Sequence, residues 1–103
     1  MRTRFLLAAV LASAPLATPA QTPEALYVRG LAASCANCHG TDGRAAAGAG
    51  MPGLAGQPRD YLLQQLRAFR DGSRPATVMH QIAKGYSEPQ LQQLASYFAA
   101  QTK

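Results

Sequence analysis

Hydrophobic residues recur at helical spacing in three stretches of the chain, and each stretch carries start or end signals of an α-helix. The first begins at Thr22, which can cap a helix. Pro23 suits the first helical position, and Glu24 faces the positive end of the helix dipole. Gly30 lies on or near one face with Leu26, Tyr27 and Leu31, and a glycine inside a helix costs about 1 kcal/mol relative to alanine. We therefore expect another helix to pack closely against Gly30, with a merely tolerated glycine as the alternative.

The second and third stretches lie in the C-terminal half of the chain. The second covers residues 59–71, and Gly72 can close it as a C-terminal cap. The third covers residues 87–101 and starts with a capping box formed by Ser87 and Gln90. The residues expected to face inward are Leu62, Leu66 and Phe69 in the second stretch, and Leu91, Leu94, Ala95 and Phe98 in the third. The pattern predicts an all-α fold with three main helices joined by short turns, in which the first and last helices cross.

Residues 1–20 have the composition of a secretory signal peptide. Two arginines precede an apolar run over residues 5–14, and the small residues at positions 18–20 resemble a cleavage site. The apolar run is too short to span a bilayer. We expect export to the periplasm and cleavage, which would leave residues 21–103 as one domain without a membrane span. The alternative is an uncleaved amphipathic anchor.

The sequence Cys35-Ala36-Asn37-Cys38-His39 is a C-x-x-C-H run, which is typical of covalent haem c attachment. Two thiols on one side of a helical turn can add to the two vinyl groups of one haem, and His39 can then ligate the iron. The alternatives are a dithiol redox site, a structural disulfide and half of a zinc site. Zinc is the weakest of these, because His80 is the only other histidine and there is no third cysteine.

Helical periodicity disappears over residues 40–57, where glycine, alanine and proline predominate and predict a loop. Small residues would let this backbone lie flat along a haem. Pro52 is a candidate to accept the ring N–H of His39 through its carbonyl, which would fix the tautomer of the ligand. The alternative is an ordinary turn proline. Met51 lies only 12 residues after His39, and we expect it to be a wall or surface residue.

Met79 lies 40 residues after His39, far enough for the chain to pass the haem edge and return on the other face. A thioether there is a soft ligand that favours ferrous iron and raises the reduction potential. His80 follows directly and would give a bis-histidine haem of lower potential. From residue chemistry we prefer Met79 as the sixth ligand, with His80 or an open sixth position as alternatives.

Size and charge add little to this interpretation. Residues 21–103 hold eight Lys and Arg and five Asp and Glu side chains, and the cationic ones are scattered along the chain. The aromatic residues look like members of helix faces rather than a stacking platform, so nothing indicates nucleic-acid binding. A domain of this size often needs a covalent or metal staple, which a haem would provide.

Several motifs together resemble a known family. They are Ser34 to Gly43, Pro52 to Gln57, Tyr61-Leu62 with Leu66, Arg74 to Met79, Ile82 to Ser87 and Ala95 to Phe98. With them the chain resembles a class I c-type cytochrome, and within that group it is similar to the cytochrome subunit of flavocytochrome c sulfide dehydrogenase. The likeness extends over residues 21–103. Some such subunits carry two haem domains, whereas this sequence has a single C-x-x-C-H run and no internal repeat.

This resemblance implies Cys35 and Cys38 as thioether sites, His39 as the proximal iron ligand and Met79 as the distal ligand, with no catalytic residue. It implies periplasmic electron transfer through one covalent haem c, from an FAD-containing sulfide dehydrogenase subunit to another periplasmic carrier. The chain would be an electron-transfer subunit that is not catalytic by itself. The alternatives are a diffusible cytochrome that donates to a terminal oxidase or reductase, and a ligand-binding haem protein.

Overall fold

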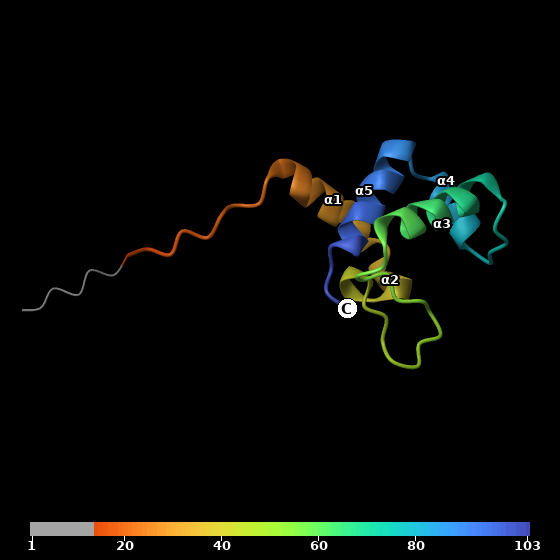
Figure 1. The fold of residues 1–103 in the computed structure, drawn as a ribbon, viewed down its shortest axis with the longest axis horizontal. Coiled ribbons are helices and arrows are strands. Elements are labelled where there is room, and N and C mark those ends of the chain that lie inside the picture. The colour runs from red at the N-terminus through yellow and green to blue at the C-terminus, as the bar shows by residue number, and fades with distance from the viewer. Residues whose placement is uncertain (1–13) are drawn as a thin grey trace, which may run out of the picture.

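The computed structural model describes residues 14–103, and in this range the regular structure is entirely helical. The elements in chain order are α1 (Pro23–Ala33), α2 (Ala36–His39), the 3-10 helix η1 (Thr41–Gly43), α3 (Arg59–Asp71), α4 (Met79–Lys84) and α5 (Glu88–Ala99). Figure 1 shows residues 14–22 as an extended segment without regular structure that leads away from the helical body. The expected signal peptide lies mostly outside the described residues.

The ends of the three long helices agree with the local signals in the sequence. The Thr22 hydroxyl accepts a hydrogen bond from the amide of Ala25 at 3.1 Å, which caps α1. The capping box of α5 forms in both directions between Ser87 and Gln90. Gly72 ends α3 in the left-handed conformation, with φ of 84°. The predicted all-α class with three main helices is therefore confirmed, and α2, η1 and α4 are short helices within the connecting segments.

The core forms around one face of α5. The residues predicted to face inward on this helix are all buried: Leu91, Leu94, Ala95 and Phe98 are at most 4% exposed. They pack in one cluster with Ala32 of α1 and with Leu62 and Leu63 of α3. Figure 1 shows α5 between α1 and α3, so both other long helices meet it. Full burial of one leucine side chain contributes roughly 1.5–3 kcal/mol, which makes this face the main apolar contribution to folding.

Gly30 does not have the role that we expected from its place in α1. The first and last helices do pack together, but a Cβ atom added at Gly30 would meet nothing within 4 Å. Ala32 is instead the buried residue of α1, at 4% exposure. The expectation of a close helix approach at Gly30 was therefore wrong, because α1 meets α5 through a neighbouring face.

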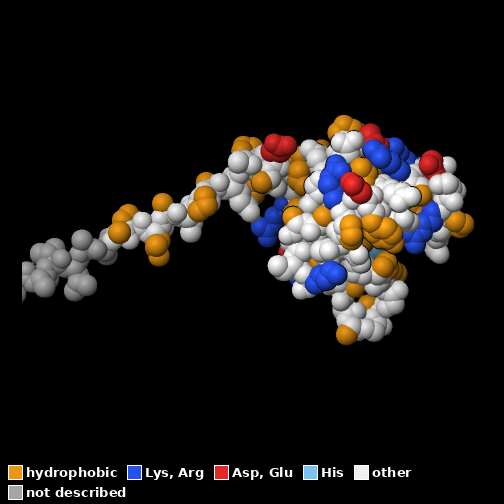
Figure 2. Space-filling model, in the orientation of Figure 1, with side chains coloured by type: hydrophobic (Ala, Val, Ile, Leu, Met, Phe, Trp, Pro, Cys, Tyr) orange, Lys and Arg blue, Asp and Glu red, His pale blue; other side chains and the backbone are white. Residues whose placement is uncertain are grey.

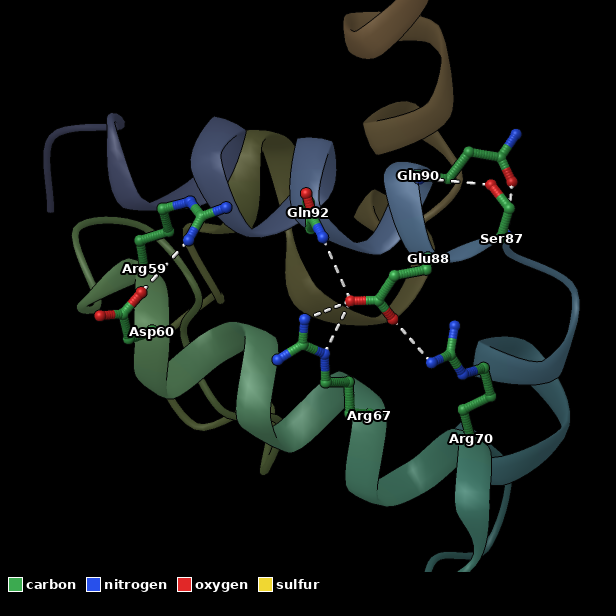
Figure 3. Close-up of polar contacts among 8 residues, drawn as sticks. All are labelled: Arg59, Asp60, Arg67, Arg70, Ser87, Glu88, Gln90 and Gln92. Carbon is green, nitrogen blue, oxygen red and sulfur yellow. Dashed lines mark hydrogen bonds and ion pairs between the residues drawn. The ribbon is translucent and has the colours of Figure 1, made fainter.

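Glu88 joins α5 to α3 through a group of hydrogen-bonded ion pairs, drawn in Figure 3. Its Oε1 accepts from Nε of Arg67 at 2.8 Å and from Gln92, and its Oε2 accepts from Arg70 at 2.7 Å. The hydrogen bonds from Arg67 and then Arg70 stabilise the ionised carboxylate and lower the pKa of Glu88 to about 2. Glu88 therefore stays charged in the folded protein well below its ordinary pKa.

We expect the Glu88→Gln substitution to destabilise the protein at neutral pH and to have little effect near pH 2. The unfolded carboxyl has an ordinary pKa near 4.5, whereas the folded one is at about 2, so the stabilisation is complete above the first value and is lost as the pH falls to the second. Urea unfolding of both proteins from pH 7 to pH 2 measures this. The gap between the two midpoints should close in that interval.

Glu24→Gln is the matched control, because Glu24 also lies in the first turn of a helix but has no ion pair among the described residues. Its midpoint should fall only slightly below that of the wild type at neutral pH, through the loss of the helix-dipole interaction that both glutamates share, and much less than that of Glu88→Gln. A Glu88→Gln gap of equal size at pH 7 and pH 2 would contradict the assignment.

Candidate functional site

The two cysteines and the histidine of the C-x-x-C-H run share the turn formed by α2. The carbonyl of Cys35 accepts the amides of Cys38 at 3.3 Å and His39 at 2.9 Å, which closes the turn. Cys38 is exposed, whereas Cys35 is half-buried and its burial raises the pKa of the thiol. Both side chains are free thiols in this structure. The arrangement leaves two thiols three positions apart on one turn, as attachment to a single haem requires.

His39 is buried, and one of its ring nitrogens has a defined partner. The exposed fraction of His39 is 9%, and its Nδ1 lies 2.8 Å from the carbonyl oxygen of Pro52. A carbonyl can only accept, so the hydrogen bond requires a proton on Nδ1. In the neutral imidazole this leaves the lone pair on Nε2, which is the form that ligates a metal. The predicted hydrogen bond between the His39 ring and the Pro52 carbonyl is confirmed.

Hydrogen bonds to η1 hold together the two ends of the loop that carries Pro52. The carbonyl of Gly43 accepts the amides of Leu54 at 2.8 Å and Ala55 at 3.2 Å. Gly43 is buried at φ of 79°, and a Cβ atom there would lie 2.8 Å from the Phe98 ring. This position therefore needs glycine both for its backbone conformation and for the close approach of α5.

Met79 and His80 lie on a different element from the cysteines. They begin α4, which packs against α3, and Figure 1 shows α4 well apart from α2. The Nδ1 atom of His80 is buried and has no hydrogen-bond partner among the described residues. Met79 is half-buried. The structure therefore keeps both candidates for the sixth ligand on a single turn, away from the turn that holds His39.

One contact connects the two regions. The hydroxyl of Tyr86, just after α4, lies 2.9 Å from the hydroxyl of Ser34, the residue before Cys35. The chain that follows Met79 and His80 in α4 thus returns to the start of the C-x-x-C-H run.

Large apolar side chains remain at the surface of the elements that follow the loop. Tyr61, Val78 and Ile82 are between 42% and 49% exposed. Figure 2 shows hydrophobic side chains gathered over the middle of one face, above the loop that protrudes at the bottom. Apolar groups collected in this way usually meet a ligand or partner. Together with the tautomer of His39 and the two free thiols, they fit a large apolar prosthetic group that would be bonded at α2.

A cluster around Asp42 was not foreseen from the sequence. Asp42 has φ of 53° and is the one non-glycine residue with positive φ in the described part of the chain, a conformation that costs roughly 1 kcal/mol. Its carboxylate accepts a hydrogen bond from the hydroxyl of Tyr97 and pairs with Arg44 at 3.6 Å. The hydrogen bond to Asp42 is the main cause that raises the pKa of the Tyr97 hydroxyl above its ordinary value. The only local signal for this position in the sequence is the Asp42-Gly43 pair.

Other features of the described residues lie outside this site. A groove of about 840 Å³ runs between the start of α1, η1 and α5, and none of the predicted haem residues lines it. Between residues 14 and 103, no three His, Cys, Asp or Glu side chains gather in a way that could hold a metal ion by themselves. Within the same range, no helix is long and apolar enough to cross a membrane.

Two relatives are similar to most of this chain. The "Thiosulfate dehydrogenase electron acceptor" of Thiomonas intermedia is 43% identical over 93 residues, which are 90% of this chain and 40% of that protein. The "Cytochrome subunit of sulfide dehydrogenase" of Chlorobaculum tepidum is 40% identical over 91 residues, which are 86% of this chain and 80% of that subunit. This chain therefore spans less than half of the first relative and most of the second.

Solved structures and a family model agree with these relatives. The cytochrome c4 of Acidithiobacillus ferrooxidans superposes with a TM-score of 0.61 at 42% identity, over 65% of this chain and 38% of that one. The family model for cytochrome c matches residues 28–101, which include the C-x-x-C-H run, the loop and all the helices from α2 to α5. On this evidence the chain belongs to the cytochrome c family and has the class I all-α fold.

Proposed function

We propose that this protein transfers electrons in the periplasm through one haem c and receives them from the flavin subunit of a sulfide-oxidising enzyme. Membership of the cytochrome c family implies covalent haem c and electron transfer. The finer proposals are that Cys35 and Cys38 form the thioethers, that His39 is the proximal ligand and that Met79 is the distal ligand. When bound, the haem supplies a one-electron couple between ferric and ferrous iron.

The observation that carries this proposal is the hydrogen bond between the ring of the buried His39 and the carbonyl of Pro52. It holds the imidazole in one tautomer, and it does so beside the two thiols that would fix the porphyrin to the same turn. A hydrogen-bond acceptor on Nδ1 also makes the imidazole a better electron donor to the iron. A thioether from Met79 on the other side would favour the ferrous state, so the two ligands would set the potential in opposite directions.

The shares of the two relatives that this chain covers support one electron donor over the other. The sulfide dehydrogenase subunit is similar over 86% of this chain and 80% of its own length, so the two proteins correspond almost throughout. In the thiosulfate dehydrogenase electron acceptor, more than half of the protein has no counterpart here. Correspondence along most of both proteins favours the role of the sulfide dehydrogenase subunit. Transfer from a thiosulfate dehydrogenase is the second candidate, because that relative has the slightly higher identity.

The mass of the protein tests cleavage and haem number together. After expression in a host that exports and matures haem c, we expect the mass of residues 21–103 plus one haem, in the periplasmic fraction. This result follows if residues 1–20 are a signal peptide and the single C-x-x-C-H run is occupied. A mass equal to the bare chain would remove the haem assignment and return the two cysteines to a dithiol or disulfide role.

Replacing Met79 by alanine tests the distal ligand. We expect Met79→Ala to lose the methionine–iron band of the ferric spectrum and to bind carbon monoxide when ferrous, because the sixth position opens. The wild-type protein should not bind carbon monoxide at neutral pH. Met51→Ala is the matched control, since Met51 is exposed on the loop and should leave the spectrum unchanged. An unchanged spectrum in Met79→Ala, with a changed one in His80→Ala, would assign the ligand to His80.

Sulfide reduction tests the partner. We expect the native protein, purified gently at low salt, to elute from gel filtration with a flavoprotein, and we expect sulfide to reduce its haem rapidly. Thiosulfate should be much slower. Haem that elutes alone and is not reduced by sulfide would favour the diffusible carrier, and rapid reduction with thiosulfate in the presence of its dehydrogenase would favour the second candidate.

A further inference from the structure

The Pro52 carbonyl, which accepts a hydrogen bond from the His39 ring, is positioned by hydrogen bonds that join the two ends of its loop. Pro52 lies two residues before Leu54, whose amide donates to the Gly43 carbonyl at 2.8 Å. The amide of Ala55 donates to the same oxygen at 3.2 Å. A shift of Gly43 would therefore move Leu54 and Pro52 with it. The 2.8 Å contact between Pro52 and His39 depends on where η1 is held.

Three side chains hold η1 against the C-terminal part of the protein. Asp42 precedes Gly43 and accepts a hydrogen bond from the Tyr97 hydroxyl. Arg44 follows, pairs with the same carboxylate and donates to the carbonyl of Thr102 at 2.8 Å and to its hydroxyl at 2.9 Å. The Tyr97 ring stands edge-on to Phe98, with ring centroids 5.3 Å apart and planes at 88°, so its hydroxyl has a fixed place on α5.

We propose that Tyr97 and Asp42 are positioning residues for the proximal haem ligand. Their hydrogen bond fixes the left-handed turn at η1, and the turn keeps the Pro52 carbonyl on Nδ1 of His39. This inference rests on the proposed ligation of haem iron by His39. Neither Tyr97 nor Asp42 has to touch the haem, because both act through the loop. Their effect is on the strength of the ligand and hence on the reduction potential.

The haem-loaded Tyr97→Phe variant tests this proposal, since it removes one hydroxyl and keeps the ring that packs on Phe98. We expect a more positive reduction potential than in the wild type, because a weaker acceptor on Nδ1 makes the imidazole a poorer donor to ferric iron. The ring N–H of His39, observed by NMR, should exchange with solvent about tenfold faster. The amides of Leu91 and Leu94 should keep their exchange rates, since they report on opening of the core.

Two control variants separate the hydrogen bond from other effects. Tyr27→Phe removes a hydroxyl that accepts from Gln90 at 2.9 Å between α1 and α5, and it should leave the potential and the His39 exchange rate unchanged. Asp42→Asn keeps an acceptor and a side chain that tolerates positive φ, so it should retain slow His39 exchange. Asp42→Ala should instead resemble Tyr97→Phe in this measurement.

Two results would overturn the inference. If Tyr97→Phe lowers only the unfolding midpoint and keeps the wild-type potential and His39 exchange, its hydroxyl has a structural role alone. If the wild type lacks a haem-shifted ring proton from His39, the proposed ligation fails and this inference fails with it. The first result leaves the proposed function standing, so the two failures are distinguishable.

Discussion

Burial of one face of α5 is the constraint on which the other contacts depend. Leu91 and Ala95 on this face are fully buried. Two helices from different parts of the chain, α1 and α3, pack against α5. The C-x-x-C-H run follows α1 directly, and the loop with Pro52 leads into α3. Both halves of the candidate site are thus attached to helices that are placed by α5. In a domain with so small a core, a few apolar side chains carry this arrangement.

The C-terminal end of α5 has a second task, because it also meets the loop itself. The carbonyl of Phe98 accepts the amide of Gly56 at 2.9 Å, and the Phe98 ring lies so close to Gly43 that a side chain there would collide with it. Asp42 and Tyr97 add a polar contact beside this apolar one. Both ends of the loop are therefore fastened to one helix, which explains how a segment rich in glycine and alanine can present a carbonyl at a defined place.

Much of the fold could be predicted from the sequence because its signals are local. Caps and apolar spacing are properties of neighbouring residues, and Pro52 lies only 13 positions after His39 in the chain. The role expected for Gly30 was wrong because helical spacing does not tell which side of a helix meets its neighbour. The bond between Asp42 and Tyr97 could not be foreseen either, since it joins residues 55 positions apart and depends on how α5 lies over η1.

The partner of His39 is a main-chain oxygen, and this has a consequence for how the site can change over time. Every amino acid has such an oxygen, so no substitution at position 52 deletes the acceptor, and replacement of the proline acts only through the path of the chain. A change in spacing is different, because one residue inserted or deleted between Pro52 and Leu54, whose amide is bonded to Gly43, would bring another carbonyl to the imidazole or none. Evolution and protein engineering should therefore tolerate varied side chains at position 52 while conserving its spacing to Leu54.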